Sequence, residues 1–158
     1  MTPTEGKRKS LRLKKIKLLV LDADGVLTDG RIYMSEGGGE SVAFDVRDGL
    51  GIVALLKGGV EVAVLSGRMS DAIRNRSQKL GISEVRLGER EKGKALREMA
   101  RSREIALEEI AYIGDDLTDL SAMSLAGFSV AVADAVPEVR KKASYVTSRE
   151  GGRGAVRE

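Results

Sequence analysis

Short apolar segments alternate with helix-like segments along most of this chain, and this alternation limits the fold more than any other feature. The segments predicted as buried strands are residues 16–21, 60–65, 85–87, 110–113 and 128–131, with a last short strand at 145–146. The segments predicted as helices are residues 50–57, 70–80, 92–102 and 118–125, with a short last helix opened by Pro137. This order predicts βαβ units and a three-layer, Rossmann-like α/β fold with a mainly parallel sheet.

The chain divides into a basic leader, one domain and a glycine-rich tail. Residues 1–15 are predicted to be a solvated, disordered leader, because the first 17 residues hold seven basic side chains and one acidic side chain. Residues 16–148 are predicted to form the domain, in which residues 31–45 form a β-hairpin flap around a glycine-rich tip. Residues 149–158 form a Gly/Arg-rich C-terminal tail.

Two absences restrict the chemistry. The chain contains no Cys and no His, which excludes thiol nucleophiles, disulfides, His-based triads and His metal ligands. It has no run of 18 apolar residues and no signal-peptide pattern, so neither a membrane span nor secretion is predicted, and a cytoplasmic location is expected. The basic leader has no aromatic residue for base stacking, and nucleic-acid binding is not predicted either.

Polar side chains stand where the predicted strands end. In chain order they are Asp22 and Asp24 after the first strand, Ser66 after the second, Lys92 after the third, and Asp115 and Asp116 after the fourth. Each alone is compatible with turn chemistry, helix capping or a solvated surface. In a parallel sheet, however, the carboxyl ends of the strands meet at the edge where ligands bind. Carboxylates gathered there repel one another unless a cation neutralises them. The pattern therefore predicts Mg²⁺ bound by Asp22, Asp115 and the backbone carbonyl of Asp24, with Asp116 and Asp119 as outer or partial ligands.

The same residues suit phosphoryl transfer. A carboxylate can attack a phosphoryl group and form an aspartyl-phosphate, and the transfer itself needs mainly positioning and charge neutralisation. Ser66 and Gly67 offer a hydroxyl and backbone N–H groups to phosphate oxygens, and Lys92 offers a compact positive charge. Because the chain has no His, a second carboxylate must protonate the leaving oxygen, and Asp24 is predicted to be this acid and base.

Four motifs in this order resemble those of the haloacid dehalogenase superfamily. They are Asp22-Ala23-Asp24-Gly25-Val26-Leu27-Thr28-Asp29-Gly30, Ser66-Gly67-Arg68, Lys92, and Gly114-Asp115-Asp116-Leu117-Thr118-Asp119. The resemblance implies that Asp22 is the nucleophile, Asp24 the acid and base, Ser66 and Lys92 the phosphate holders, and Asp115 a Mg²⁺ ligand. Many members carry a cap domain, but the intervals between these motifs are too short for one.

Further segments narrow the resemblance to the capless 3-deoxy-D-manno-octulosonate 8-phosphate phosphatases. These segments are residues 30–33, 44–49, 130–135 and 151–158. The resemblance implies Mg²⁺-dependent hydrolysis of that sugar phosphate, a step towards lipopolysaccharide. It also implies a homotetramer in which the flap meets a neighbouring subunit and helps to close its active site. An open site has a physical need for such a neighbour, because an aspartyl-phosphate is better kept from bulk water.

Four arginines and one glycine are candidates for substrate binding. Arg47 follows the flap and suits a substrate carboxylate, which a guanidinium binds through two hydrogen bonds. Gly67 and Arg68 lie in the second motif, and Arg153 and Arg157 lie in the tail, where they can fold over an anionic site.

Three other functions compete with this one. A phosphatase for nine-carbon sugar acid 9-phosphates (the sialic-acid type) shares the fold and the motifs, and only the segment around Arg47 favours the eight-carbon substrate. A receiver-like phosphoacceptor module would place its Asp after the third strand, where this chain has Leu87-Gly88-Glu89. A catalytically silent subunit is disfavoured because every motif residue is present.

Overall fold

A computed structural model describes residues 13–158, so most of the predicted leader lies outside the described residues. Six strands form one parallel sheet in the order β5-β4-β1-β6-β7-β8. They are β1 (Leu18–Leu21), β4 (Glu61–Ser66), β5 (Glu84–Leu87), β6 (Ile110–Gly114), β7 (Phe128–Ala131) and β8 (Tyr145–Val146). The predicted α/β fold with a parallel sheet is confirmed.

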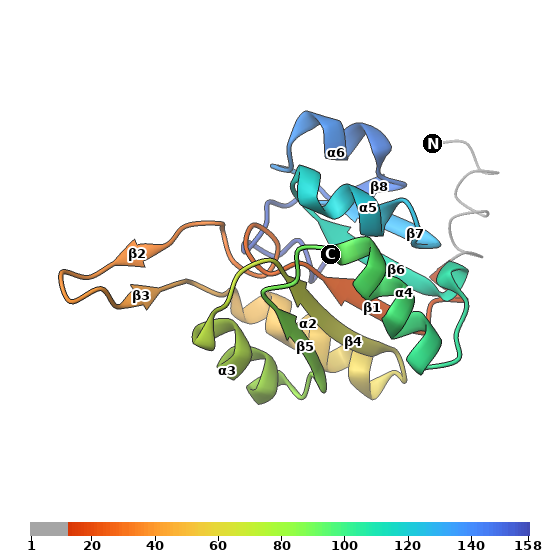
Figure 1. The fold of residues 1–158 in the computed structure, drawn as a ribbon, viewed down its shortest axis with the longest axis horizontal. Helices are drawn as coiled ribbons and strands as arrows, with labels where there is room; N and C mark the ends of the chain where they lie inside the picture. Colours follow the sequence, from red (N-terminus) through yellow and green to blue (C-terminus); the bar gives the residue numbers. More distant parts are fainter. Residues whose placement is uncertain (1–12) are drawn as a thin grey trace.

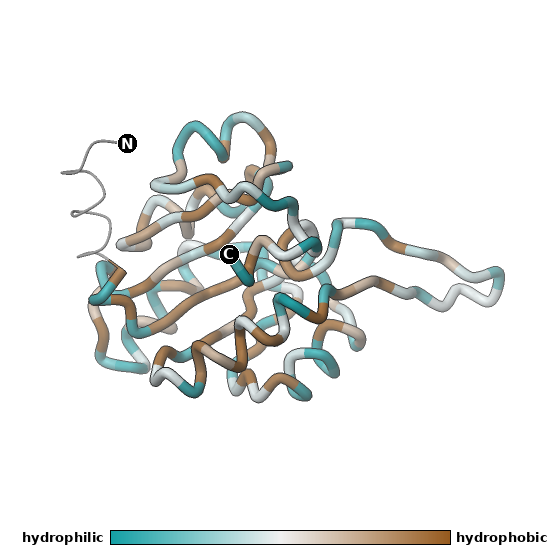
Figure 2. The backbone as a smooth tube through the Cα atoms, turned by 180° about the vertical axis from the view of Figure 1, so that it is seen from behind, coloured by the Kyte–Doolittle hydropathy of each residue, from teal (hydrophilic) through white to brown (hydrophobic). Residues whose placement is uncertain are grey.

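The helices cover both faces of this sheet. They are α2 (Val46–Lys57), α3 (Asp71–Leu80), α4 (Lys92–Ser102), α5 (Leu120–Met123) and α6 (Pro137–Lys142), with 3₁₀ turns at Leu107–Glu109 and Leu117–Asp119. Figure 1 shows α4 and α5 in front of the sheet and α2 behind it. The central strands are buried between these layers, and Figure 2 shows them as apolar stretches through the middle of the molecule. None of the helices in residues 13–158 has the length and apolar composition needed to cross a membrane.

Side-chain caps explain where α2, α3 and one 3₁₀ turn begin. Ser70 caps α3 by accepting a hydrogen bond from the N–H of Ile73, and Gly81 ends that helix with a φ of 82°. The helix predicted over 50–57 begins earlier, at Val46, because the Asp45 carboxylate caps it by accepting from the N–H of Arg47. The helix predicted over 118–125 is split, because the Asp116 carboxylate caps a 3₁₀ turn before α5 begins.

The predicted flap is a separate two-stranded sheet of β2 (Tyr33–Met34) and β3 (Glu40–Ser41). It projects from the body as an arm in both views (Figures 1 and 2). The chain returns to the body near Phe44, which pairs with Thr28 in an isolated antiparallel bridge. The base of the flap is thereby attached to the loop that follows β1.

Candidate active site

The carboxyl ends of β1, β4 and β6 meet around an open cavity of about 320 Å³. Its walls hold eight of the residues predicted from the sequence, namely Asp22, Asp24, Ser66, Gly67, Arg68, Lys92, Asp115 and Asp116. Gly25, Gly30 and Thr118 also line it. The residues of the four motifs, which are spread over about 95 positions of sequence, therefore share one site.

A buried lysine between two carboxylates forms the floor of this site. The Lys92 side chain is 2% exposed, and its Nζ lies 2.8 Å from Asp22 Oδ2 and 2.7 Å from Asp119 Oδ1. An ammonium buried to this extent is stable only with anionic partners, and the two carboxylates raise the pKa of Lys92 although burial opposes them. Lys92 thus fixes the position of Asp22.

Asp119 accepts hydrogen bonds from four groups around the site. Its Oδ1 accepts from Lys92 and, at 2.7 Å, from the hydroxyl of Tyr112, while its Oδ2 accepts from the backbone N–H groups of Asp115 and Asp116 at 2.9 and 3.2 Å. These four donors occupy the lone pairs of both carboxylate oxygens, so Asp119 is better suited to hold its neighbours than to bind a metal directly. Tyr112 was not predicted as a site residue because, within a buried strand, it is indistinguishable from a core aromatic.

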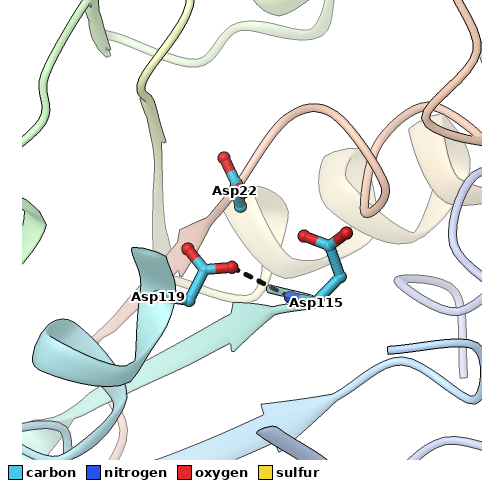
Figure 3. Close-up of side chains that lie close together, drawn as sticks. All are labelled: Asp22, Asp115 and Asp119. Carbon is cyan, nitrogen blue, oxygen red and sulfur yellow. Dashed lines mark hydrogen bonds between the residues drawn. The ribbon is translucent and has the colours of Figure 1, made fainter. Parts of the chain in front are cut away.

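Asp22, Asp115 and Asp119 bring carboxylate oxygens within 4.8 Å of one another (Figure 3). Burial, and then the charges of Asp22 and Asp119, raise the pKa of Asp115 to about 8. Burial, and then Asp119, raise the pKa of Asp22 to about 7, against the lowering effect of Lys92. Asp115 Oδ1 is buried and has no hydrogen-bond partner among the described residues. An orphaned carboxylate oxygen beside a second carboxylate fits a hard cation such as Mg²⁺, which would favour the ionised forms of both groups.

Asp24 faces a different partner. Its two carboxylate oxygens accept from Nε and Nη2 of Arg68, each at 2.8 Å, and Nη1 of Arg68 reaches Glu40 of β3 at 2.9 Å. Arg68 therefore connects the predicted acid and base to the flap. Glu40 has no sequence signal as a site residue, since it lies in a glycine-rich hairpin far from every motif.

Ser66 is the last residue of β4 and is 1% exposed. Its Oγ accepts from the N–H of Arg68 at 3.2 Å, and Gly67 leaves the backbone beside it open to the cavity. The turn after β4 thus places the Ser66 hydroxyl and the Gly67 backbone at the cavity, and a role of either in holding phosphate stays a prediction.

Comparisons with known proteins agree with this geometry. Residues 84–156 match the family model described as haloacid dehalogenase-like hydrolase. The chain is 46% identical over 147 residues to the 3-deoxy-D-manno-octulosonate 8-phosphate phosphatase KdsC of Yersinia pestis, covering 93% of this chain and 79% of that protein. It is 47% identical to KdsC of Escherichia coli K12, covering 93% and 78%. The chain belongs to the KdsC family. The predicted family is therefore confirmed, and so is the enzyme class of a phosphatase.

A solved structure of a relative connects this family to a metal. The 3-deoxy-D-manno-octulosonate 8-phosphate phosphatase of Moraxella catarrhalis, crystallised with a magnesium ion, a phosphate ion and a KDO molecule, superimposes with a TM-score of 0.93. It is 40% identical to this chain, and the match covers 96% of this chain and 87% of the relative. That a member binds Mg²⁺ and phosphate agrees with the carboxylate cluster described above.

Three predicted substrate-binding arginines lie outside the acidic cavity of this chain. The Arg47 guanidinium pairs with Asp45, and its Nη2 also donates to the carbonyl of Arg153 at 3.2 Å. Arg47 and Arg153 line a second, wide cavity of about 800 Å³ at the base of the flap. Arg157 is held by its backbone, whose N–H donates to the buried Asp48 at 2.8 Å. A role of these arginines in substrate binding stays a prediction.

Proposed function

We propose that this KdsC-family protein hydrolyses 3-deoxy-D-manno-octulosonate 8-phosphate to the free sugar acid and phosphate, through an aspartyl-phosphate on Asp22. The observation that carries the proposal is the buried Asp22–Lys92–Asp119 network, which lies beside Asp115 in an open cavity at the strand ends. The identity of the chain to phosphatases of this substrate supports the choice of substrate.

In the first step the Asp22 carboxylate forms a bond to phosphorus, and the bond from phosphorus to the sugar oxygen breaks. Ser66, Gly67 and Lys92 hold the phosphate oxygens, because they offer hydrogen-bond donors around the same cavity. Asp24 gives its proton to the departing sugar oxygen. Since both Asp24 oxygens are bonded to Arg68 in the substrate-free chain, the sugar oxygen must replace at least one of these bonds.

In the second step Asp24 takes a proton from water, whose oxygen attacks the phosphorus of the aspartyl-phosphate. The bond to Asp22 breaks, phosphate leaves, and the Asp22 carboxylate is restored. Asp22, Asp115 and the Asp24 carbonyl would hold Mg²⁺, which would supply positive charge to the transferring phosphoryl group. The cytoplasmic location expected from the sequence stays a prediction.

We further propose a homotetramer in which the flap contacts a neighbouring copy. Three consecutive flap residues with large apolar side chains, Ile32, Tyr33 and Met34, are 43%, 54% and 63% exposed. An arm with this much apolar surface is typical of an interface between chains. Light scattering on the wild type and on a Tyr33→Ser, Met34→Ser double variant tests this: the wild type is expected at four copies and the variant at fewer. A fully active wild-type monomer would contradict the proposal that the flap of one copy helps to close the active site of another.

The proposed reaction is tested by measuring phosphate release with Mg²⁺. The substrates are 3-deoxy-D-manno-octulosonate 8-phosphate, a nine-carbon sugar acid 9-phosphate and glucose 6-phosphate, with Asp22→Asn as the inactive control. We expect kcat/KM to be highest for the eight-carbon substrate. Equal or faster turnover of the nine-carbon substrate would reject the proposed substrate and leave the phosphatase chemistry in place. Retained activity of Asp22→Asn would reject Asp22 as the nucleophile.

A further inference from the structure

The glycine-rich segment 151–157 packs against the back of the catalytic loop, which we define as residues 22–30. Four residues of the segment, Gly151, Gly154, Ala155 and Val156, are buried. The N–H of Gly152 donates to the carbonyl of Val26 at 2.8 Å. The segment thus lies behind the residues that carry the proposed chemistry, and the mechanism above gives it no part.

Gly151 contacts the catalytic loop so closely that a larger side chain does not fit. A methyl group on Gly151 would overlap the carbonyl oxygen of Gly25, and one on Gly152 would overlap the backbone of Thr28 and Asp29. Gly152 also has a φ of 62°, which favours glycine. Backbone meets backbone here without side chains between, so a shift of the segment is transmitted directly to the loop.

Gly25 is held on its other side by the acidic cluster. A methyl group on Gly25 would overlap the carboxylate of Asp115. Gly25 therefore lies between the Gly151 backbone and a proposed Mg²⁺ ligand. The peptide that joins Asp24 to Gly25 carries the carbonyl predicted to bind the same ion. The position of this carbonyl depends on both contacts of Gly25.

Two carboxylates anchor the segment. Asp48, in the first turn of α2 and 2% exposed, accepts from the N–H of Gly154 at 3.1 Å through Oδ2 and from the N–H of Arg157 at 2.8 Å through Oδ1. Asp134, after β7, accepts from the N–H of Gly151 at 2.9 Å. A buried carboxylate is costly unless its hydrogen bonds are made, so Asp48 keeps the segment in this one arrangement.

We propose that residues 151–157 are a brace that holds the Asp24–Gly25 peptide in place for Mg²⁺, and that Asp48 is a positioning residue which fixes this brace. The inference rests on the proposed function for the identity of the metal site. Groups that orient metal ligands change metal affinity or activity by about 10- to 100-fold when they are removed. Ser66 and Lys92, which hold the phosphate in our mechanism, belong to β4 and α4, and none of the described hydrogen bonds or ion pairs joins them to the brace. Its loss should therefore lower Mg²⁺ affinity and kcat and leave KM nearly unchanged.

The test compares Gly151→Ala and Asp48→Asn with two matched controls. Gly58→Ala adds the same methyl group at the C-terminal end of α2, where its nearest neighbours are the carbonyl oxygens of Leu55 and Ala54 at 3.3 and 3.4 Å. Asp71→Asn removes the charge of an exposed acid in the first turn of α3. Titration calorimetry of each folded, metal-free protein with Mg²⁺ alone measures the affinity without turnover. We expect a loss of about tenfold or more for Gly151→Ala and about three- to tenfold for Asp48→Asn, and a change below about twofold for the controls.

Steady-state kinetics on the same four variants then separate kcat from KM. If the segment is a brace, kcat falls together with Mg²⁺ affinity in Gly151→Ala and Asp48→Asn. If the segment only packs against the loop, these variants have a lower Tm but wild-type Mg²⁺ affinity and kcat, and this result would overturn the proposal. If Gly151→Ala does not fold, Asp48→Asn decides by the same two readouts. Because calorimetry uses no sugar phosphate, the brace is tested even if the wild type rejects the proposed substrate.

Discussion

Replacing Asp115 by Asn should stabilise the metal-free protein while removing its response to Mg²⁺. In the unfolded chain the Asp115 carboxyl ionises near its ordinary pKa of 3.8, whereas in the folded metal-free protein burial and the neighbouring carboxylates raise that pKa to about 8. Between these values the folded state binds more protons than the unfolded state, so the free energy of unfolding falls as pH rises from about 4 to about 8. Because Asn carries no charge, the free energy of unfolding of the variant does not fall in this way as pH rises.

The expected gain in the free energy of unfolding follows from the rise in the pKa of Asp115. At about 1.36 kcal/mol per pKa unit, the rise from 3.8 to about 8 corresponds to about 5–6 kcal/mol at pH 8. Water at the open mouth of the cavity screens part of this repulsion, so we expect Asp115→Asn to be more stable than the wild type by about 2–3 kcal/mol at pH 8 in EDTA. For a chain of this length that is about 4–12 °C in Tm. At pH 4 the difference should vanish.

Thermal melts at pH 4 to 8, with EDTA and with Mg²⁺, measure both parts of this prediction. Saturating Mg²⁺ at a hundredfold excess over its Kd should stabilise the wild type by about 2.7 kcal/mol and should stabilise Asp115→Asn much less. An exposed acid changed in the same way, Asp71→Asn, is the control and should show neither effect. The reasoning is refuted if Asp115→Asn is less stable than the wild type in EDTA at pH 8, or if Mg²⁺ stabilises both proteins equally.

Three further substitutions test the network around the cavity. Lys92→Met leaves the carboxylates of Asp22 and Asp119 without their cation, so chemical denaturation should show a loss of about 3–5 kcal/mol, and phosphate release should fall at least about 100-fold. Tyr112→Phe removes one hydrogen-bond donor from buried Asp119 and should lower the free energy of unfolding by about 2 kcal/mol in the same denaturation assay. The control is Tyr145→Phe: the Tyr145 hydroxyl donates to exposed Glu158, and its loss should change stability by less than about 0.5 kcal/mol. Equal losses would contradict a special role of Tyr112. Asp24→Asn should slow hydrolysis of the sugar phosphate by about 10²- to 10⁴-fold. It should slow formation of the aspartyl-phosphate from p-nitrophenyl phosphate far less, because nitrophenolate leaves without a proton. Equal losses of both rates in rapid-mixing experiments would show that Asp24 is not the acid.

The sequence alone indicated the fold class and the residues gathered at the site. Four of the five longer predicted strands begin and end within a residue of the observed ones, and α4 has the predicted bounds, because apolar periodicity is a local signal. Asp22, Asp24, Ser66 and Asp115 were found because each stands at or next to the end of such a strand. In a parallel sheet the ends of the strands converge, so position in sequence was enough to bring these residues together.

Long-range contacts were beyond the sequence. Nothing local in the sequence indicated that Gly151 and Gly152 lie against the back of the catalytic loop, or that Gly154 is held by Asp48, which is 106 positions away. No periodicity links such partners. The pairing of Arg47 with Asp45 is local, but the sequence did not indicate it either, since both side chains could equally face solvent or substrate.

Lys92 shows most clearly what can be predicted from the sequence and what depends on the tertiary structure. Its place after a predicted strand, together with the acids at the other strand ends, predicted it as the cation of a phosphate site. Only the tertiary structure decided that its ammonium would be buried between Asp22 and Asp119, with Tyr112 completing the shell of Asp119. Strand and helix patterns depend on neighbours along the chain and can be read from the sequence. The balance of burial and charge that raises the pKa of Asp22 and Asp115 depends on groups from β1, β6, α4 and the turn after β6, which are neighbours only in the folded protein.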